Sequence, residues 1–447
     1  MIIIEHSTFD ENSIAENLGL PEYSYWFVRK AFRRVLSRFG VPVGVTDPTR
    51  EVDRIHHAAK AHGIDSVFLS YNPPHHLPVG LDCPTVPVFA WEYDTIPNEV
   101  WENEPRNNWA AVLSSLPAAV THCSFTADAV RRELGANYPI WSIPAPVFES
   151  NAPKAFSAQG WRDSFEIVLS RGVAIDSRAI DLALFRPDRP DDRGYHALRL
   201  LDVAAQTSRP ALRLSLRGVI YNAVFNPVDG RKNWMDMIVG FIAAFRDQAD
   251  ATLIIKITHR SLIDGALPIL NHLSRLGDFA CRVILVHGLL ADDEYSGLVE
   301  ATSFAVNTSN GEGQCLPLME FMSAGRPAVA PRHTAMLDYV NAENSFIVSS
   351  GMRQATWAHD PRQVIRCLRH EISVADLVRQ FRASFVVARD DPDRYRSMSV
   401  AATQSLRAYC SDAVVLERLS NVLAHMGLGG KSDASAERRR QRVGARP

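Results

Sequence analysis

The chain has 447 residues, of which 46% are hydrophobic and 22% are charged. Its formal net charge of −2 creates no overall positive field for nucleic acid, and no run of about 18 apolar residues would cross a membrane. The six cysteines lie far apart without a Cys-x-x-Cys pair, so we expect reduced thiols in the cytoplasm, with no zinc site and no disulfide framework. The length exceeds that of one typical core and predicts two domains.

The first third of the chain alternates short apolar runs with helical patterns, which predicts parallel α/β layers. The expected strands cover residues 1–5, 41–45, 66–69, 86–90, 118–122 and 140–143. The expected helices cover residues 24–38, 50–61, 107–113 and 126–134. Together these elements predict a Rossmann-like domain over residues 1–150.

Two carboxylates follow the expected strand 86–90. Glu92 lies between two aromatic residues, and Asp94 comes shortly after it. Because α/β sheets bind ligands at the carboxyl ends of their strands, these side chains are in a position to contact a ligand. The paired histidines His75 and His76 also follow a strand, but no third ligand at a suitable spacing is visible, and we expect no metal.

Two segments have no clear α/β pattern. Residues 151–212 include a stretch rich in proline, aspartate and arginine at 186–194, a composition typical of a loop, and we interpret 151–212 as an insertion or linker. The tail 427–447 is rich in glycine, small polar residues and arginine, and we expect it to be disordered. Its arginines favour either a solvated tail or peripheral contact with anionic lipid headgroups.

A second α/β domain is predicted over residues 213–426. Its expected strands cover residues 215–225, 252–257, 282–286, 303–307, 327–330 and 345–348. Its expected helices cover residues 234–245, 361–374, 375–388 and 413–425. The C-terminal helices would complete this domain.

A pair of cations stands where the first strand of this second domain gives way to a helix. Arg231 and Lys232 follow a turn after residue 225 and directly precede the helix expected from Trp234. Two positive side chains beside a helix N-terminus are suited to a diphosphate that is bound without a metal ion. Alone, the pair would be read more simply as a solvated basic turn.

The most informative stretch covers residues 311–331. Glu312 lies on a glycine-containing loop, and Glu320 lies in what we expect to be the first turn of a short helix that starts near Pro317. Gly325 and Pro327 predict the end of that helix. Its N-terminus would point at the carboxyl end of the preceding strand, so both carboxylates can face one ligand. The plain alternative is a strand-loop-helix unit with two solvated glutamates.

This stretch resembles the donor-site motif of the retaining glycosyltransferases of family 4, roughly E-G-F-G-L-P-L-x-E-A-M-A-x-G-x-P. The matching residues are Glu312, Gly313, Leu316, Pro317, Glu320, Met322, Gly325 and Pro327. Gln314 and Cys315 replace the usual aromatic-glycine pair. The turn with Arg231 and Lys232 resembles the element of the same family that contacts the donor diphosphate. Residues 286–298 resemble the segment beside the nucleotide base, where Gly288 and Leu289 would lie against the base.

The resemblance implies a GT-B fold, in which two Rossmann-like domains face each other across a cleft and the last helix typically crosses back to the first domain. It also implies transfer of a sugar, with retention of configuration, from a nucleotide-diphosphate-sugar donor to a saccharide or lipid-linked saccharide. Arg231 and Lys232 would stabilise the departing diphosphate. Glu312 would contact the donor sugar, and Glu320 would accept the ribose hydroxyls.

The remaining expectations also depend on this resemblance. Gly313, Gln314, Cys315 and Leu316 would line the donor site. Glu92 and Asp94 would bind the acceptor, and no cofactor or metal ion is expected besides the sugar donor itself. Two alternatives stay open: a GT-B nucleotide-sugar epimerase, and a non-catalytic nucleotide-sugar-binding subunit of a partner enzyme.

Overall fold

The computed structural model describes residues 1–152, 164–170, 172–188, 192–206, 211–357 and 360–428. The chain forms two compact units. The first holds Met1–Thr8, Ser24–Pro146 and the chain from Asp412, and the second holds Phe9–Tyr23 and Val147–Ser411. None of the helices in the described ranges is long and apolar enough to span a bilayer. The tail predicted to be disordered lies, from residue 429 on, outside the described residues.

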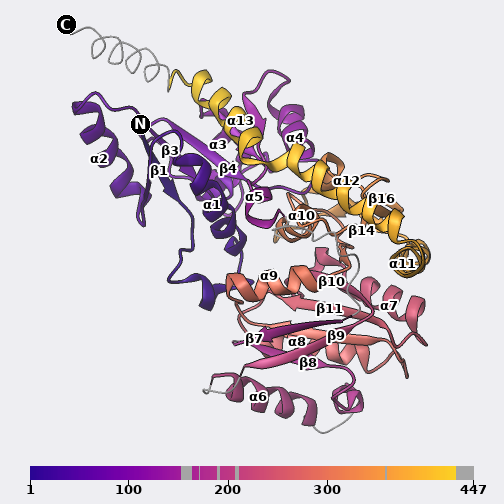
Figure 1. The fold of residues 1–447 in the computed structure, drawn as a ribbon. Helices are drawn as coiled ribbons and strands as arrows, with labels where there is room; N and C mark the ends of the chain where they lie inside the picture. Colours follow the sequence, from indigo (N-terminus) through magenta and orange to yellow (C-terminus); the bar gives the residue numbers. More distant parts are fainter. Residues whose placement is uncertain (153–163, 171, 189–191, 207–210, 358–359, 429–447) are drawn as a thin grey trace, which may run out of the picture. The chain divides into compact units, whose positions relative to one another are not determined.

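The first unit is built on a parallel six-stranded sheet (Figure 1). The strand order is β2 (Val41–Gly44), β1 (Ile2–His6), β3 (Ser66–Ser70), β4 (Thr85–Phe89), β5 (Ala119–Thr121) and β6 (Ile140–Ser142). One face packs its apolar side chains against α2 (Pro48–Ala61) and α3 (Trp109–Ser114). The other packs against α1 (Tyr23–Leu36) and α13 (Asp412–His425) around a small apolar cavity. The helix α4 (Ser124–Leu134) links β5 to β6. Every strand and helix expected over residues 1–150 is confirmed within a few residues.

The second unit is built on a seven-stranded sheet. The strand order is β15 (Ser345–Val348), β14 (Ala328–Pro331), β13 (Phe304–Val306), β10 (Val219–Phe225), β11 (Ala251–Ile257), β12 (Arg282–His287) and β8 (Val173–Asp176). The first six are parallel, and β8 runs antiparallel to β12. From β10 the chain adds strands outward on one side, then returns to add β13 to β15 on the other. This is the doubly wound Rossmann order.

Different layers cover the two faces of the second sheet. One face packs on α7 (Trp234–Phe245), α8 (Leu262–Leu273) and α11 (Val374–Asp390), and its centre is a cluster of fully buried aromatic rings around Tyr221. The opposite face packs on α9 (Asp292–Ala301) and on a two-stranded ribbon of β7 (Ser164–Leu169) and β9 (Leu212–Arg217). The helices α10 (Leu316–Ser323) and α12 (Pro392–Cys410) pack on each other.

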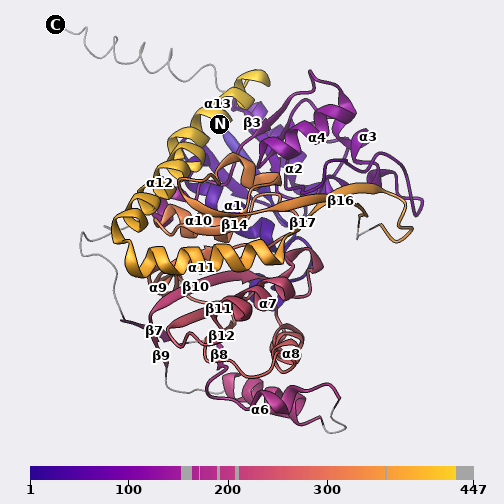
Figure 2. The ribbon, with the colours of Figure 1, turned by 90° about the vertical axis from the view of Figure 1, so that its right-hand side faces the viewer.

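Several expectations for the second half of the chain are wrong in detail. The single strand expected at 215–225 is split at Gly218 into β9 and β10, because Gly218 turns the backbone at a φ of +75°. The helix expected at 361–374 is instead β17 (Arg366–Ile372), which pairs antiparallel with β16 (Ser350–Thr356) in a long ribbon (Figure 2). The scattered charged residues of this segment resemble the pattern of an exposed helix, but only pairing with the partner strand determines its extended conformation.

Residues 151–212, interpreted above as an insertion or linker, contain regular structure where they are described. They form β7, β8 and α6 (Arg193–Gln206), and β8 is an edge strand of the second sheet. The helices α8, α9 and α12 had not been expected from the sequence. The C-terminal helices expected at 375–388 and 413–425 are confirmed as α11 and α13, of which α13 belongs to the first unit.

Candidate functional site

The order of the second sheet itself marks a ligand site. The chain leaves β10 in one direction to form β11 and later returns to the other side of β10 to form β13. In doubly wound sheets, ligands bind outside the carboxyl ends of the strands at this switch point. The loop after β10 carries Arg231 and Lys232, and the loop after β13 carries Glu312. The structure therefore brings the three residues predicted to be catalytic to one place.

The two cations sit on a short 3-10 turn, Gly230–Lys232, that Asp229 caps by accepting a hydrogen bond from the Arg231 N–H. Asn233, at a φ of +50°, then reverses the chain into α7. The Thr308 hydroxyl donates to the Lys232 carbonyl at 3.3 Å, and the Asn310 N–H donates to the Arg231 carbonyl at 2.7 Å. The two loops are thus held together by one bond between their backbones and one from the Thr308 side chain.

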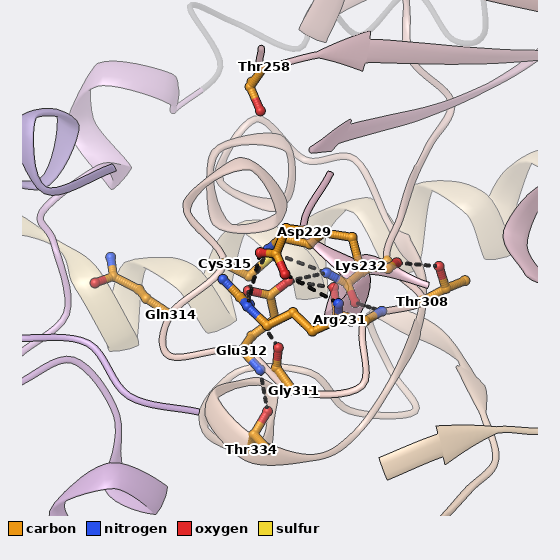
Figure 3. Close-up of polar contacts among 12 residues, drawn as sticks. Asp229, Arg231, Lys232, Thr258, Thr308, Gly311, Glu312, Gln314, Cys315 and Thr334 are labelled. Atoms are coloured by element: carbon orange, nitrogen blue, oxygen red, sulfur yellow. Dashed lines mark hydrogen bonds and ion pairs between the residues drawn. The ribbon is translucent and has the colours of Figure 1, made fainter. Parts of the chain in front are cut away.

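The Glu312 carboxylate is the centre of the cluster (Figure 3). Its side chain is only 3% exposed. Lys232 Nζ donates to its two oxygens at 2.7 and 3.0 Å, and the Arg231 guanidinium donates at 2.9 Å. The Ser309 hydroxyl donates at 2.5 Å and Asn307 Nδ2 at 3.2 Å. Because a carboxylate accepts about four hydrogen bonds, these contacts already occupy Glu312, and its contact with a donor sugar stays a prediction.

Charge balance explains why such a buried cluster is stable. Burial alone would raise the pKa of the Glu312 carboxyl, but the Lys232 and Arg231 cations outweigh it and lower that pKa below its ordinary value. Burial and Arg231 would lower the pKa of Lys232, but Glu312 and Asp229 raise it above its ordinary value. Asp229 also pairs with Arg231 at 3.1 Å. Glu312, Lys232 and Arg231 are therefore all ionised at neutral pH, and the two cations share the Glu312 carboxylate.

The two residues that depart from the family motif behave differently. Cys315 takes the left-handed backbone conformation at a φ of +64°, which the sequence had led us to expect at a glycine. Asn307 Nδ2 lies 3.1 Å from its sulfur, and burial raises the pKa of the thiol to about 12, so it stays protonated. Gln314 is 5% exposed, its amide atoms have no hydrogen-bond partner among the described residues, and in Figure 3 it points away from Glu312.

The second glutamate of the motif lies on α10, which begins at Leu316 with Pro317 in its first turn. Glu320 is in the second turn of this helix, not the first as expected, because the helix starts one residue before the proline. Its Oε2 atom accepts a hydrogen bond from the hydroxyl of Tyr295 on α9, at 2.7 Å. Sequence reasoning missed Tyr295, although it lies within the segment that resembles the family.

Gly288 and Leu289 follow β12, as the expected base-contacting segment requires. Gly288 has a φ of +115°, and a Cβ there would lie 2.9 Å from the Cα of Gly172. Close packing against Gly172 therefore explains why position 288 needs a glycine. Contact of these two residues with a base stays a prediction.

Residues from the beginning of the chain also contribute to the second unit. The Asn226 side chain donates to the Gly19 carbonyl at 2.8 Å, and the Arg260 N–H donates to the Leu18 carbonyl at 2.8 Å. The Tyr23 hydroxyl lies 3.1 Å from that of Thr258. These contacts fix residues 9–23 against the carboxyl ends of β10 and β11, next to the cation pair. The sequence analysis did not predict this docking.

Glu92 and Asp94, the candidate acceptor residues, belong to the other unit. Both follow β4 and are half-buried. The Asp94 carbonyl accepts from the Arg132 side chain at 2.7 Å, and the indole N–H of Trp91 donates to Thr95 at 2.6 Å. This loop is ordered by its own contacts, and its role stays a prediction.

No protein-family model matches the sequence, and neither does any curated protein. Several solved structures match the fold. Sucrose-phosphate synthase from Thermosynechococcus elongatus has a TM-score of 0.55 at 12% identity, with 95% of this chain and 99% of that chain covered. HepE from Anabaena, solved with UDP-glucose, has a TM-score of 0.52 at 14% identity, again with 95% and 99% covered. S. aureus TarM has a TM-score of 0.47, and the chain spans only 55% of its length.

The chain has the GT-B fold. This statement rests on the two doubly wound sheets, which follow each other in sequence, and on the coverage of HepE and the synthase over nearly their full lengths. At 12–14% identity the likeness shows the fold alone, so what those proteins bind enters only the proposal that follows.

Proposed function

We propose that the chain is a glycosyltransferase that moves a sugar from a nucleotide-diphosphate donor to a hydroxyl of a saccharide or lipid-linked saccharide, with retention of configuration. One observation carries the proposal. Arg231 and Lys232 converge at the switch point of the second sheet, where the N-terminus of α10 also begins after the Glu312 loop. The binding of UDP-glucose by HepE, a protein of the same fold, supports the nucleotide-sugar donor.

In this proposal Arg231 and Lys232 stabilise the leaving group. As the bond between sugar and diphosphate breaks, negative charge grows on the β-phosphate, and the two fixed cations and the positive end of the α10 dipole stabilise it. Such preorganised charge requires no metal ion, and we propose that none takes part.

Glu312 would act through these cations. Its carboxylate would hold Arg231 and Lys232 in place, and together with Asp229 it would balance their charge. This role is different from the sugar contact expected from the family motif. Glu320 would accept the ribose hydroxyls, and Glu92 and Asp94 would belong to acceptor binding.

Turnover of the isolated chain tests the proposal. We would measure release of nucleoside diphosphate from UDP-, GDP- and ADP-sugars, with and without saccharide acceptors. Lys232→Ala should lose on the order of a hundredfold in kcat/KM, the effect of deleting one preorganised electrostatic donor. Lys60→Ala, an exposed lysine on α2, is the matched control and should keep full activity.

The outcomes separate the alternatives. Near-normal turnover in a folded Lys232→Ala protein would contradict the assignment of the diphosphate site. Binding of a donor without any turnover would favour the non-catalytic subunit. Turnover that converts the donor sugar without any acceptor would favour the epimerase.

A further inference from the structure

A side-chain hydrogen bond joins Tyr295 on α9 to Glu320 on α10. Both side chains are half-buried, on two different helices, and the hydroxyl donates to the carboxylate Oε2 at 2.7 Å. Burial, and then the adjacent Glu320 carboxylate, raise the pKa of Tyr295 well above its ordinary value. The phenol is therefore a permanent donor, and its bond to an ionised acceptor belongs to the stronger class of hydrogen bonds.

The helix that carries Tyr295 is firmly anchored. The Ala291 N–H at the start of α9 donates to Glu294 Oε2 at 2.9 Å, and the Ser170 hydroxyl donates to Glu294 Oε1 at 2.6 Å. The Tyr295 ring also packs edge-on against Phe321, which follows Glu320 and is 1% exposed, with ring centres 6.2 Å apart. The phenol hydroxyl consequently has little freedom to follow Glu320 if that side chain moves.

We propose that Tyr295 is a positioning residue that sets the orientation of the Glu320 carboxylate, and through it the preference of the donor site for ribonucleotides. Two hydroxyls on adjacent ribose carbons can be accepted together only if the plane of the carboxylate is fixed. A glutamate has three rotatable side-chain bonds, and Tyr295 restricts them before the ligand arrives. The inference rests on the proposed function, because it needs Glu320 to face a nucleotide ribose.

Calorimetric titration with UDP and with 2′-deoxy-UDP tests this inference. The wild-type protein should bind UDP more tightly by roughly tenfold, since a hydrogen bond to a charged group is lost with the 2′-hydroxyl. Tyr295→Phe removes one oxygen atom and should reduce that ratio to about the value of Glu320→Gln. The double variant should show no further reduction, because both changes remove the same oriented acceptor.

Tyr395→Phe is the matched control. This tyrosine also donates to a fixed oxygen, the Ser303 carbonyl at 2.8 Å, but Ser303 precedes β13 whereas the site follows it. The control should keep the wild-type ratio, which separates loss of orientation from general loosening of the fold.

Three results would overturn the inference in different ways. If Tyr295→Phe keeps the wild-type ratio while Glu320→Gln loses it, Glu320 contacts ribose without help from Tyr295. If Glu320→Gln also keeps the ratio, the ribose role of Glu320 is wrong, and the inference is wrong with it. If neither UDP nor 2′-deoxy-UDP binds the wild-type protein, the site does not accept a uridine nucleotide, and the inference is overturned for this ligand.

Discussion

Replacing Glu312 by Gln should reveal how much the two cations depend on one buried carboxylate. The substitution keeps the size of the side chain but leaves Lys232 and Arg231 facing each other, with side chains that are 15% and 27% exposed. Breaking a buried ion pair from one side costs about 3–5 kcal/mol. Because both cations regain some hydration, we expect the lower end, about 3 kcal/mol, in the free energy of unfolding.

Chemical denaturation of Glu312→Gln beside Asp229→Asn is the assay. Asp229 is the second carboxylate on Arg231, but its side chain is 30% exposed and its removal should cost at most about 1 kcal/mol. Asparagine also preserves the cap of the 3-10 turn. Saturating UDP should narrow the deficit of Glu312→Gln, because phosphate charge replaces the lost carboxylate. If Glu312→Gln is no less stable than Asp229→Asn, the central position of Glu312 in the cluster is refuted.

Three further outcomes are expected. The stability difference between wild type and Glu312→Gln should be constant at neutral pH. It should narrow as pH falls below the ordinary glutamate pKa of 4.5, because the carboxyl then takes up a proton in the unfolded chain while its lowered pKa keeps it ionised in the fold; a difference independent of pH down to about pH 2 would contradict this. Turnover should survive excess EDTA; loss that manganese or magnesium restores would contradict metal-free catalysis. Gly19→Ala should lower the melting temperature more than Gly63→Ala does. Both glycines have positive φ, but only at Gly19 would an added Cβ lie 2.7 Å from the Thr258 carbonyl oxygen. Equal effects on the melting temperature would refute the docking of residues 9–23.

The sequence predicted the sheets better than their edges. Parallel strands buried on both faces, such as β11, have continuous apolar runs that few other structures produce. The ribbon of β16 and β17 has exposed, charged residues on both strands, so its hydrogen-bonded partner rather than its own pattern fixes it. The same holds for β8, whose place at the edge of the second sheet depends on β12.

Local sequence motifs predicted part of the candidate site. Arg231, Lys232 and Glu312 do lie together. Their positions could be predicted because each follows a strand end or precedes a helix start, and these are local features of the sequence. What the sequence could not show is that Ser309 and Asn307 also donate hydrogen bonds to Glu312. Nor could it show the partners that come from distant positions, Tyr295 for Glu320 and Tyr23 for Thr258.

The central claim is that Arg231 and Lys232 bind the diphosphate of a nucleotide donor. Calorimetric titration of UDP and of uridine into the wild-type protein and the Arg231→Ala/Lys232→Ala variant tests it most directly. The account predicts that the variant loses most of its affinity for UDP and little of its affinity for uridine, which has no phosphate for the cations to contact. Equal affinity of both proteins for UDP would contradict the account.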